Sequence, residues 1–255
     1  MINVFIFLLG SAVGSFLNVL IDRLPKDESI NGRSHCDHCK KKIAWYDMFP
    51  VFSFFILGGK TRCCRKKLSF QYPLIELITG VIFVMIFKDG PHLGPSLIRS
   101  VLISGIMTCF LVIFVSDLKY HLISDYILLA LFIFSILFHL SNNETMKQFN
   151  NFILSGLIVS LPIFLIYFIS KERAMGLGDV YLAVIMGFLL GWQAGFIALY
   201  IAFITGAVYG LTAIIFKVKK LKSKVAFGPF LVIGTVVMLF WGEKILETVK
   251  RIYGF

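Results

Sequence analysis

Two aspartates stand where apolar segments of the sequence meet short polar connections. Asp117 ends one apolar run, and Asp179 follows two glycines, Gly176 and Gly178, at the start of another. A carboxylate at the edge of a membrane-length segment is costly to place and therefore indicates a function. The glycines leave room beside Asp179 for another backbone or for a substrate. Because two neighbouring carboxylates share a proton, the pair predicts general acid–base hydrolysis of a peptide bond, without a metal.

Each aspartate also has a simpler interpretation. Asp179 stands where an aspartate would cap the helix that it begins. Asp125 is a rival to Asp117 as the second carboxylate, although its own place near a helix start favours a capping or interface role. From the residues alone we predict Asp117 and Asp179 as the catalytic pair, supported by Gly176, Gly178 and Asp125.

Four of the five cysteines lie in one short basic segment. Cys36 and Cys39 form a C-x-x-C pair, and Cys63 and Cys64 are adjacent. Two separated cysteine pairs can provide the four thiolate ligands of a tetrahedral structural zinc ion. The sequence therefore predicts a zinc site at these four cysteines. A catalytic zinc is not expected, because nothing places it near the aspartates.

The cysteines and one glutamate leave alternatives open. Adjacent thiolates bind one ion only with strain, so His35 or His38 is an alternative fourth ligand, and unligated or redox-active thiols are another interpretation. Cys109 lies within an apolar run and is predicted to be a core residue. Glu76 also lies within an apolar run, where we expect it either to pair with a Lys or Arg of a loop or to contact substrate.

The surrounding chain is strongly apolar. Of its 255 residues, 58% are hydrophobic and 15% are charged, whereas about a quarter of the residues of a soluble domain are charged. This pattern predicts an all-α integral membrane protein, a polytopic bundle of about eight transmembrane helices with one cytoplasmic cysteine-containing loop module. The predicted domains are the first transmembrane helix, 1–21, the cytoplasmic loop module, 22–72, and the multi-helix membrane core with both aspartates, 73–255. The apolar segments are expected at 2–21, 72–87, 96–116, 124–140, 151–170, 180–190, 194–216 and 228–241.

Charge predicts the orientation of the chain. The net charge is +11, and with eight crossings 19 of the 25 Lys and Arg residues fall on the side that holds residues 22–72. The positive-inside rule makes that side cytoplasmic and both termini external. Asp117 and Asp179 then lie on the same, cytoplasmic face. No basic run is interleaved with aromatic residues as a base-stacking surface requires, so membrane lipid is an expected partner and nucleic acid is not.

Six short blocks of residues, spread over nearly the whole chain, carry a resemblance to a known family. With these blocks the chain resembles the bacterial type IV prepilin peptidases, also called leader peptidase/N-methyltransferases, of the GxGD class of membrane aspartyl proteases. One departure is that Thr61 stands where the family usually has the first cysteine of a second C-x-x-C pair. The blocks are Gly14-Ser15-Phe16-Leu17-Asn18-Val19 with Arg23-Leu24-Pro25; Cys36-x-x-Cys39 with Trp45-Tyr46-Asp47, Pro50 and Gly58-Gly59-Lys60; Tyr72-Pro73-Leu74-Ile75-Glu76-Leu77; Asp117-Leu118 through Ile123-Ser124-Asp125; Gly176-Leu177-Gly178-Asp179; and Phe227-Gly228-Pro229-Phe230.

The resemblance implies an activity and a location. It implies that Asp117 and Asp179 cut the leader from a prepilin-like precursor just after a glycine, on the cytoplasmic side of the bacterial inner membrane. The implied substrate has a basic leader and an apolar helix. In many members the cysteine loop accompanies a second activity, methylation of the new N-terminal amine with S-adenosylmethionine as donor. No residue is predicted to bind that donor, because no glycine-rich strand–turn–helix motif is visible.

Two other functions remain as alternatives. One is a peptidase that lacks methyl transfer because its cysteine loop is altered. The other is a non-catalytic membrane component in which Asp117 and Asp179 relay protons or cations. A relay predicts acidic residues at mid-membrane depth, whereas both aspartates are predicted at one interface, which favours the enzyme.

Overall fold

The described part of the computed structural model is helical. It comprises residues 1–30, 32, 36, 39, 41–44, 47, 49–89, 97–142, 145–173, 175–216 and 226–253. No strand is formed among these residues, and an isolated bridge joins Lys60 to Lys67. The predicted all-α class is confirmed. His35, His38, Trp45-Tyr46 and the basic run 217–224 lie outside the described residues.

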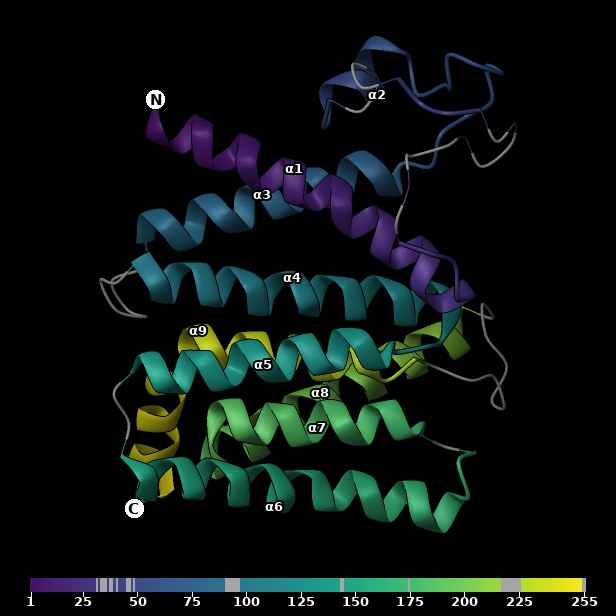
Figure 1. The fold of residues 1–255 in the computed structure, drawn as a ribbon. Helices are drawn as coiled ribbons and strands as arrows, with labels where there is room; N and C mark the ends of the chain where they lie inside the picture. Colours follow the sequence, from purple (N-terminus) through teal and green to yellow (C-terminus); the bar gives the residue numbers. More distant parts are fainter. Residues whose placement is uncertain are drawn as a thin grey trace. The chain divides into compact units, whose positions relative to one another are not determined.

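Most of the helices are of membrane-spanning length and composition (Figure 1). Six of those in the described residues are long and apolar enough to cross a bilayer: α1, α3, α4, α6, α8 and α9. The apolar helices α5 and α7 are shorter, with 17 and 14 residues. A multi-pass membrane protein is therefore supported, while eight crossings remain a prediction. The helices are α1 (Ile2–Arg23) with the 3-10 turn η1 (Leu24–Lys26), α2 (Phe52–Ile56), α3 (Gln71–Asp89), α4 (Leu97–Tyr120), α5 (Asp125–Ser141), α6 (Met146–Ser170), α7 (Leu177–Leu190), α8 (Trp192–Ile215) and α9 (Gly228–Tyr253).

Two helices extend five residues or more beyond the predicted apolar segments. Helix α6 begins at Met146 rather than near 151, because Thr145 caps it and donates a hydrogen bond of 2.8 Å from its backbone N–H to Oε1 of Gln148. Helix α9 continues to Tyr253 rather than ending near 241. Its last turn carries Lys250 and Arg251, which interact favourably with the negative end of the helix dipole. Apolar composition marks the membrane part of a helix and misses such polar extensions.

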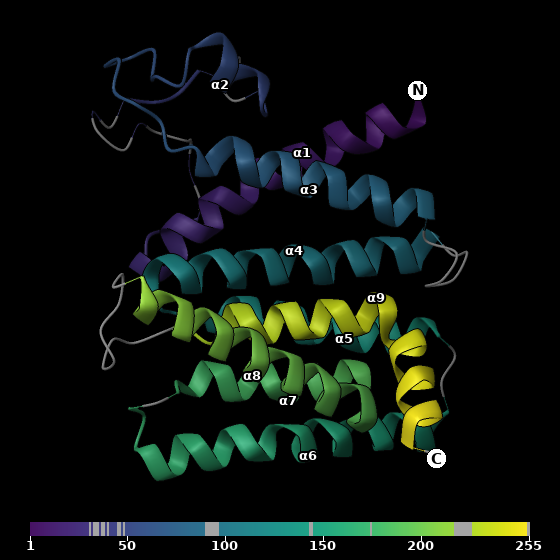
Figure 2. The same ribbon diagram turned by 180° about the vertical axis from the view of Figure 1, so that it is seen from behind.

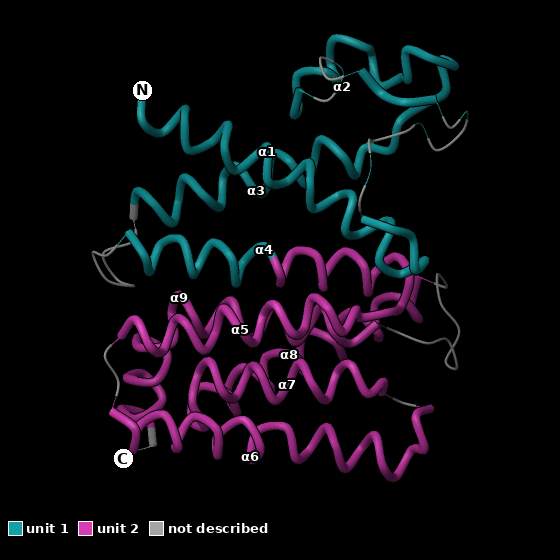
Figure 3. Tube along the Cα trace, viewed as in Figure 1, with its two compact units in different colours: residues 1–108 teal, residues 109–255 magenta. Residues whose placement is uncertain are grey.

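The chain forms two compact units, residues 1–108 and 109–255, and α4 contributes to both (Figure 3). In the first unit, α1 and α3 pack against each other as an antiparallel pair. The cysteine-containing segment, residues 27–70, connects them and includes α2. The division predicted from the sequence, into 1–21, 22–72 and 73–255, separates the chain by function and not by contacts. It remains a prediction.

Helix α7 is the central helix of the second unit. It contacts α5, α6, α8 and α9, and the two opposite views show α8 and α9 behind a layer made by α5, α7 and α6 (Figures 1 and 2). Nine of its fourteen residues are buried, including Asp179. The predicted catalytic Asp179 is therefore carried by a helix that is enclosed by protein on several sides.

Two glycines let α6 and α7 approach closely. A Cβ atom added at Gly187 of α7 would lie 2.7 Å from the carbonyl oxygen of Ser155 and 2.8 Å from Cβ of Val159, both on α6. A Cβ added at Gly156 would lie 2.7 Å from the carbonyl oxygen of Val184. Small residues at such crossings are typical of membrane helices, whose backbones pack without side chains between them.

Replacing Gly187 by alanine tests this packing. We expect Gly187→Ala to lower the stability of the protein in detergent by about 1–3 kcal/mol, because the new methyl group would collide with backbone atoms of α6. Thermal unfolding measures the effect. The matched control is Gly210→Ala in α8, where an added Cβ meets no atom within 4 Å. A Gly187→Ala protein as stable as the control would contradict the close crossing.

Candidate active site

Asp117 lies in the last turn of α4 and is buried, with 5% of its surface exposed. Its Oδ2 accepts a hydrogen bond of 3.0 Å from the backbone N–H of Gly228, the first residue of α9. The first N–H groups of a helix have no partner within the helix and carry partial positive charge. The beginning of α9 therefore supplies a preformed donor for this carboxylate.

Asp179 lies in the first turn of α7 and is also buried. Its Oδ2 accepts a hydrogen bond of 3.1 Å from the backbone N–H of Gly176, the N-cap residue of the same helix. Asp179 is not itself the N-cap residue; its bond to Gly176 is the capping-box contact made by the third residue of the helix. It uses one oxygen only: Oδ1 is buried and has no hydrogen-bond partner among the described residues. Capping leaves half of the carboxylate available for another contact.

Ile123 links the surroundings of the two aspartates. It lies in the connection between α4 and α5, and a Cβ added at Gly178 would lie 3.1 Å from its Cβ. A Cβ added at Gly228 would lie 3.1 Å from its Cδ1. The beginnings of α7 and α9 therefore pack on the same side chain, and Asp117 is near enough to act electrostatically on Asp179. The structure brings together the two aspartates that the sequence singles out.

The third aspartate, unlike Asp117 and Asp179, is not buried. Asp125 is exposed and is the first residue of α5, directly after the N-cap residue Ser124. This is the capping or interface position that the sequence favours for it. The electrostatic influence on Asp179 comes from Asp117.

Sequence reasoning missed part of the surroundings of the aspartates. It names Gly228 only within a block of the family resemblance, whereas the backbone N–H of Gly228 donates a hydrogen bond to Asp117. The signal for this role is the Gly228-Pro229 pair, since proline favours the first turn of a helix and thereby marks its free N–H groups. Ile123 and His121 were not predicted. His121 acts electrostatically on Asp117 from the residues just after α4.

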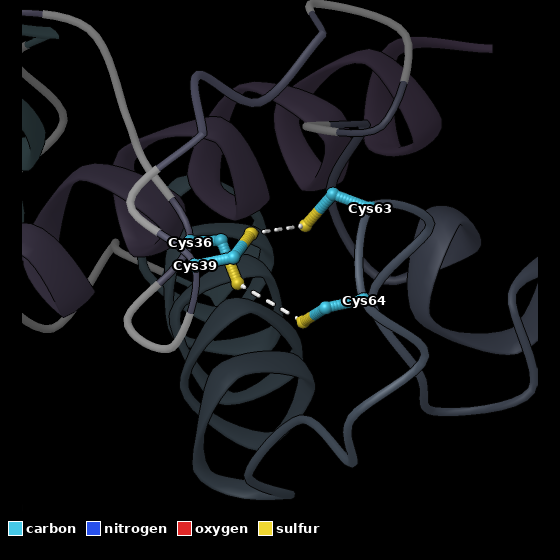
Figure 4. A group of neighbouring side chains, drawn as sticks. All are labelled: Cys36, Cys39, Cys63 and Cys64. Carbon is cyan, nitrogen blue, oxygen red and sulfur yellow. Dashed lines mark hydrogen bonds between the residues drawn. The ribbon is translucent and has the colours of Figure 1, made fainter.

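The four predicted zinc ligands come together in the first unit (Figure 4). The Sγ atoms of Cys36 and Cys64 are 3.7 Å apart, those of Cys39 and Cys63 are 3.1 Å apart, and all four lie within 4.8 Å of one another. A tetrahedral zinc ion with bonds of about 2.3 Å needs sulfur atoms about 3.8 Å apart. The donor set therefore fits zinc, and both adjacent cysteines belong to it.

Different neighbours surround the two adjacent cysteines. Thr61 is buried, and its Oγ1 lies 3.1 Å from Sγ of Cys64. This hydrogen bond lowers the pKa of the Cys64 thiol, whereas the hydrogen bond with Cys39 raises the pKa of the Cys63 thiol to about 12. The fifth cysteine, Cys109, is buried in α4, as predicted for a core residue.

Glu76 occupies neither of these sites. It is buried in α3, and its Oε2 accepts a hydrogen bond of 2.7 Å from the backbone N–H of Val51. Among the described residues no Lys or Arg forms an ion pair with it, so the expected pairing with a loop cation is not found there. Its partner is a backbone amide of the cysteine-containing segment.

Comparison with known proteins agrees with these features. The model of the bacterial peptidase A24 N-terminal domain matches residues 8–89, and that of the type IV leader peptidase family matches residues 103–211. The prepilin leader peptidase/N-methyltransferase of Pectobacterium carotovorum subsp. carotovorum is 33% identical, over 89% of this chain and 89% of its own length. The protein of the same name from Klebsiella pneumoniae is 35% identical over 74% of this chain and 86% of its own length.

More distant relatives extend over still more of the sequence. The prepilin leader peptidase/N-methyltransferase of Aeromonas hydrophila is 28% identical over 94% of this chain and 91% of its own length. No solved structure matches the chain. The residues matched by the two family models, 8–89 and 103–211, contain both aspartates and the four clustered cysteines. The resemblance noted in the sequence is confirmed, and the chain belongs to the type IV leader peptidase family.

Proposed function

We propose that this protein is a membrane aspartyl endopeptidase that removes the leader of prepilin-like precursors and then methylates the new N-terminus. Membership of the family and the name shared by its relatives support both activities. The observation that carries the peptidase proposal is the meeting of Asp117 and Asp179 in one buried place, each with one oxygen bonded to a backbone N–H. Such an arrangement holds two carboxyl groups in fixed positions and leaves their remaining oxygens available for proton transfer.

The proposed mechanism is general acid–base hydrolysis. The two carboxyl groups share one proton, because two adjacent negative charges in a buried place repel each other. The ionised group takes a proton from water, which attacks the carbonyl carbon of the scissile bond, while the protonated group donates to the carbonyl oxygen. The proton then passes to the leaving amine as the peptide bond breaks. Asp179 Oδ1, which has no partner among the described residues, is available for the shared proton or the water.

Membership of the family supports the proposed substrate, and the distribution of charge supports the proposed side of the membrane. The basic loops support a cytoplasmic site, and both aspartates lie at helix ends on that predicted face. A precursor whose apolar helix lies in the bilayer beside the enzyme would present its cut site, just after a glycine, at the depth of these helix ends. A basic leader would remain on the cytoplasmic side.

We further propose that the cysteine cluster holds a structural zinc ion. Cys36, Cys39, Cys63 and Cys64 would bind it, and the ion would stabilise a segment too short to form a hydrophobic core of its own. The ion supplies no chemistry to cleavage. For the second activity the methyl donor is S-adenosylmethionine, which supplies an electrophilic methyl group to the freed amine, and we assign no residue to its binding.

Replacing each aspartate tests the proposed pair. We expect Asp117→Asn and Asp179→Asn each to reduce kcat for cleavage of a prepilin about 10²- to 10⁴-fold, because the amide keeps the size of the side chain but cannot exchange a proton. The assay uses purified full-length enzyme in detergent, with thermal unfolding to verify the fold. Asp125→Asn should retain most of the activity. Substantial cleavage by either of the first two variants would remove that aspartate from the mechanism.

The contact between Gly228 and Asp117 gives a second test. A Cβ added at Gly228 would lie 2.6 Å from Oδ2 of Asp117, so Gly228→Ala should displace the carboxylate and lower kcat about 10-fold or more. The matched control on the same helix is Gly242→Ala, whose added Cβ would lie 3.5 Å from the flexible end of Met238. Cleavage by Gly228→Ala at the rate of the control would show that this contact does not position Asp117.

Metal analysis tests the zinc proposal. Purified protein should contain about one zinc ion per chain, and Cys64→Ser should lose most of it, because an alcohol is a poor replacement for a thiolate ligand. Cys109→Ala, at the buried cysteine of α4, should keep the full content. Metal-free wild-type protein, or equal zinc in Cys64→Ser and Cys109→Ala, would argue against the site.

A further inference from the structure

Glu76 lies in a tight seam between α1 and α3. A Cβ added at Gly14 of α1 would lie 2.8 Å from Cα of Glu76, so the two backbones are almost in contact at this point. Four residues further along α1, Asn18 Nδ2 donates a hydrogen bond of 3.2 Å to the carbonyl oxygen of Tyr72. The hydroxyl of Tyr72 in turn donates to Oδ2 of Asp22 at 3.0 Å. These contacts fix the position of Glu76 relative to both helices.

A carboxylate at this place requires an explanation. Glu76 is 8% exposed and lies within a helix of membrane-spanning length and composition, where acidic residues are rare because burial of their charge is unfavourable. Its contacts are a hydrogen bond with the Ser15 side chain and the bond of 2.7 Å from the N–H of Val51. The second bond leaves the helix pair and reaches the cysteine-containing segment.

Val51 has a strained backbone. Its φ of 62° and ψ of −51°, together with a hydrogen bond of 2.6 Å from the N–H of Phe52 to the carbonyl oxygen of Pro50, define a γ-turn of the rare form with positive φ. Positive φ is an outlier for a β-branched residue. Such strain persists only where surrounding contacts enforce it. The bond to Glu76 is made by the amide of this strained residue.

The strained turn is connected to the cysteine cluster. It begins α2, whose Phe54 packs against Phe70, with ring centres 6.1 Å apart, and against Gly59. The carbonyl oxygen of Gly59 accepts a hydrogen bond of 2.8 Å from Leu68, which closes the hairpin 59–68 that carries Cys63 and Cys64. The direction in which α2 leaves Val51 therefore affects where this hairpin lies.

We propose that Glu76 is a positioning residue that docks the cysteine-containing segment onto the α1–α3 pair by holding Val51 in its strained turn. The contacts between α1 and α3 hold the carboxylate of Glu76, and this carboxylate holds the backbone amide of Val51. The positions of α2 and of the hairpin 59–68 depend on that bond. Glu76 then acts on the segment that holds Cys63 and Cys64 and has no part in the acid–base chemistry of the second unit. The proposal rests on contacts within the first unit and does not depend on the proposed function.

Limited digestion with trypsin tests the docking. Glu76→Ala removes the acceptor, and we expect trypsin to cut the Lys- and Arg-rich hairpin 59–68 on the order of tenfold faster in the purified full-length protein. Mass spectrometry of the fragments measures the rate at these bonds. The matched control is Glu247→Ala, at an exposed glutamate of α9, which should be cut as slowly as the wild type. Digestion of Glu76→Ala at the wild-type rate would overturn the proposal.

A second variant separates docking through Val51 from a general loss of packing. Glycine adopts positive φ without strain, so in a Val51→Gly background the turn no longer needs to be enforced. There Glu76→Ala should accelerate digestion by no more than about threefold. Equal acceleration in both backgrounds would show that Glu76 does not act on this turn. Where Glu76→Ala does not fold, Glu76→Met, which keeps the length of the side chain but has no oxygen acceptor, is compared in the same two backgrounds.

Cleavage of a prepilin by the same variants distinguishes a failure of the docking proposal from a failure of the proposed function. Glu76→Ala should cut the substrate at the wild-type rate while its hairpin is digested faster, because both aspartates belong to the other unit. A wild-type protein that does not cut prepilin would refute the proposed function and leave the digestion result unchanged. A parallel loss of cleavage and protection in Glu76→Ala would overturn the assignment of Glu76 to the cysteine-containing segment alone.

Discussion

Hydrogen bonds from backbone N–H groups at helix beginnings hold the three buried acidic side chains of the described residues. Asp117 accepts from Gly228 at the start of α9, Asp179 from Gly176 at the N-cap of α7, and Glu76 from Val51 at the N-cap of α2. An ion pair would neutralise such a group and occupy its oxygens, whereas an amide stabilises one oxygen and leaves the protonation state free to change. In an apolar chain such a bond stabilises a buried carboxylate and still allows it to gain or lose a proton.

Close approach of backbones makes these bonds attainable. Two of the three donors, Gly228 and Gly176, are glycines, whose amides carry no side chain that could intervene. Gly228 meets the carboxylate of Asp117, Gly178 meets Ile123, and Gly14 meets the backbone of Glu76. The same device brings α6 and α7 together at Gly156 and Gly187. Glycine thus fixes both the packing of the bundle and the positions of its acidic groups.

The sequence predicted the residues proposed to carry the chemistry better than the contacts that position them. Apolar runs, loop charge and the Gly-x-Gly-Asp pattern led to the helical class and to Asp117 and Asp179, and the cysteine spacing led to a four-thiol cluster. These are local signals. The bond of the Gly228 amide to Asp117, the packing of Ile123 on Gly178 and Gly228, and the bond of Val51 to Glu76 depend on segments far apart in the chain. No spacing rule contains that information, because it arises only when the helices have packed.

The short length of α7 has a consequence for the surrounding lipid. A helix of 14 residues is about 21 Å long, whereas the hydrocarbon core of a typical bilayer is about 30 Å thick. Gly191 turns directly into α8 at one end and Asp179 lies at the other, so as one of the predicted crossings α7 cannot match an undeformed bilayer. Either the acyl chains thin around it or water descends to Asp179. Acyl-chain length in the membrane therefore becomes a determinant of how well this carboxylate is hydrated.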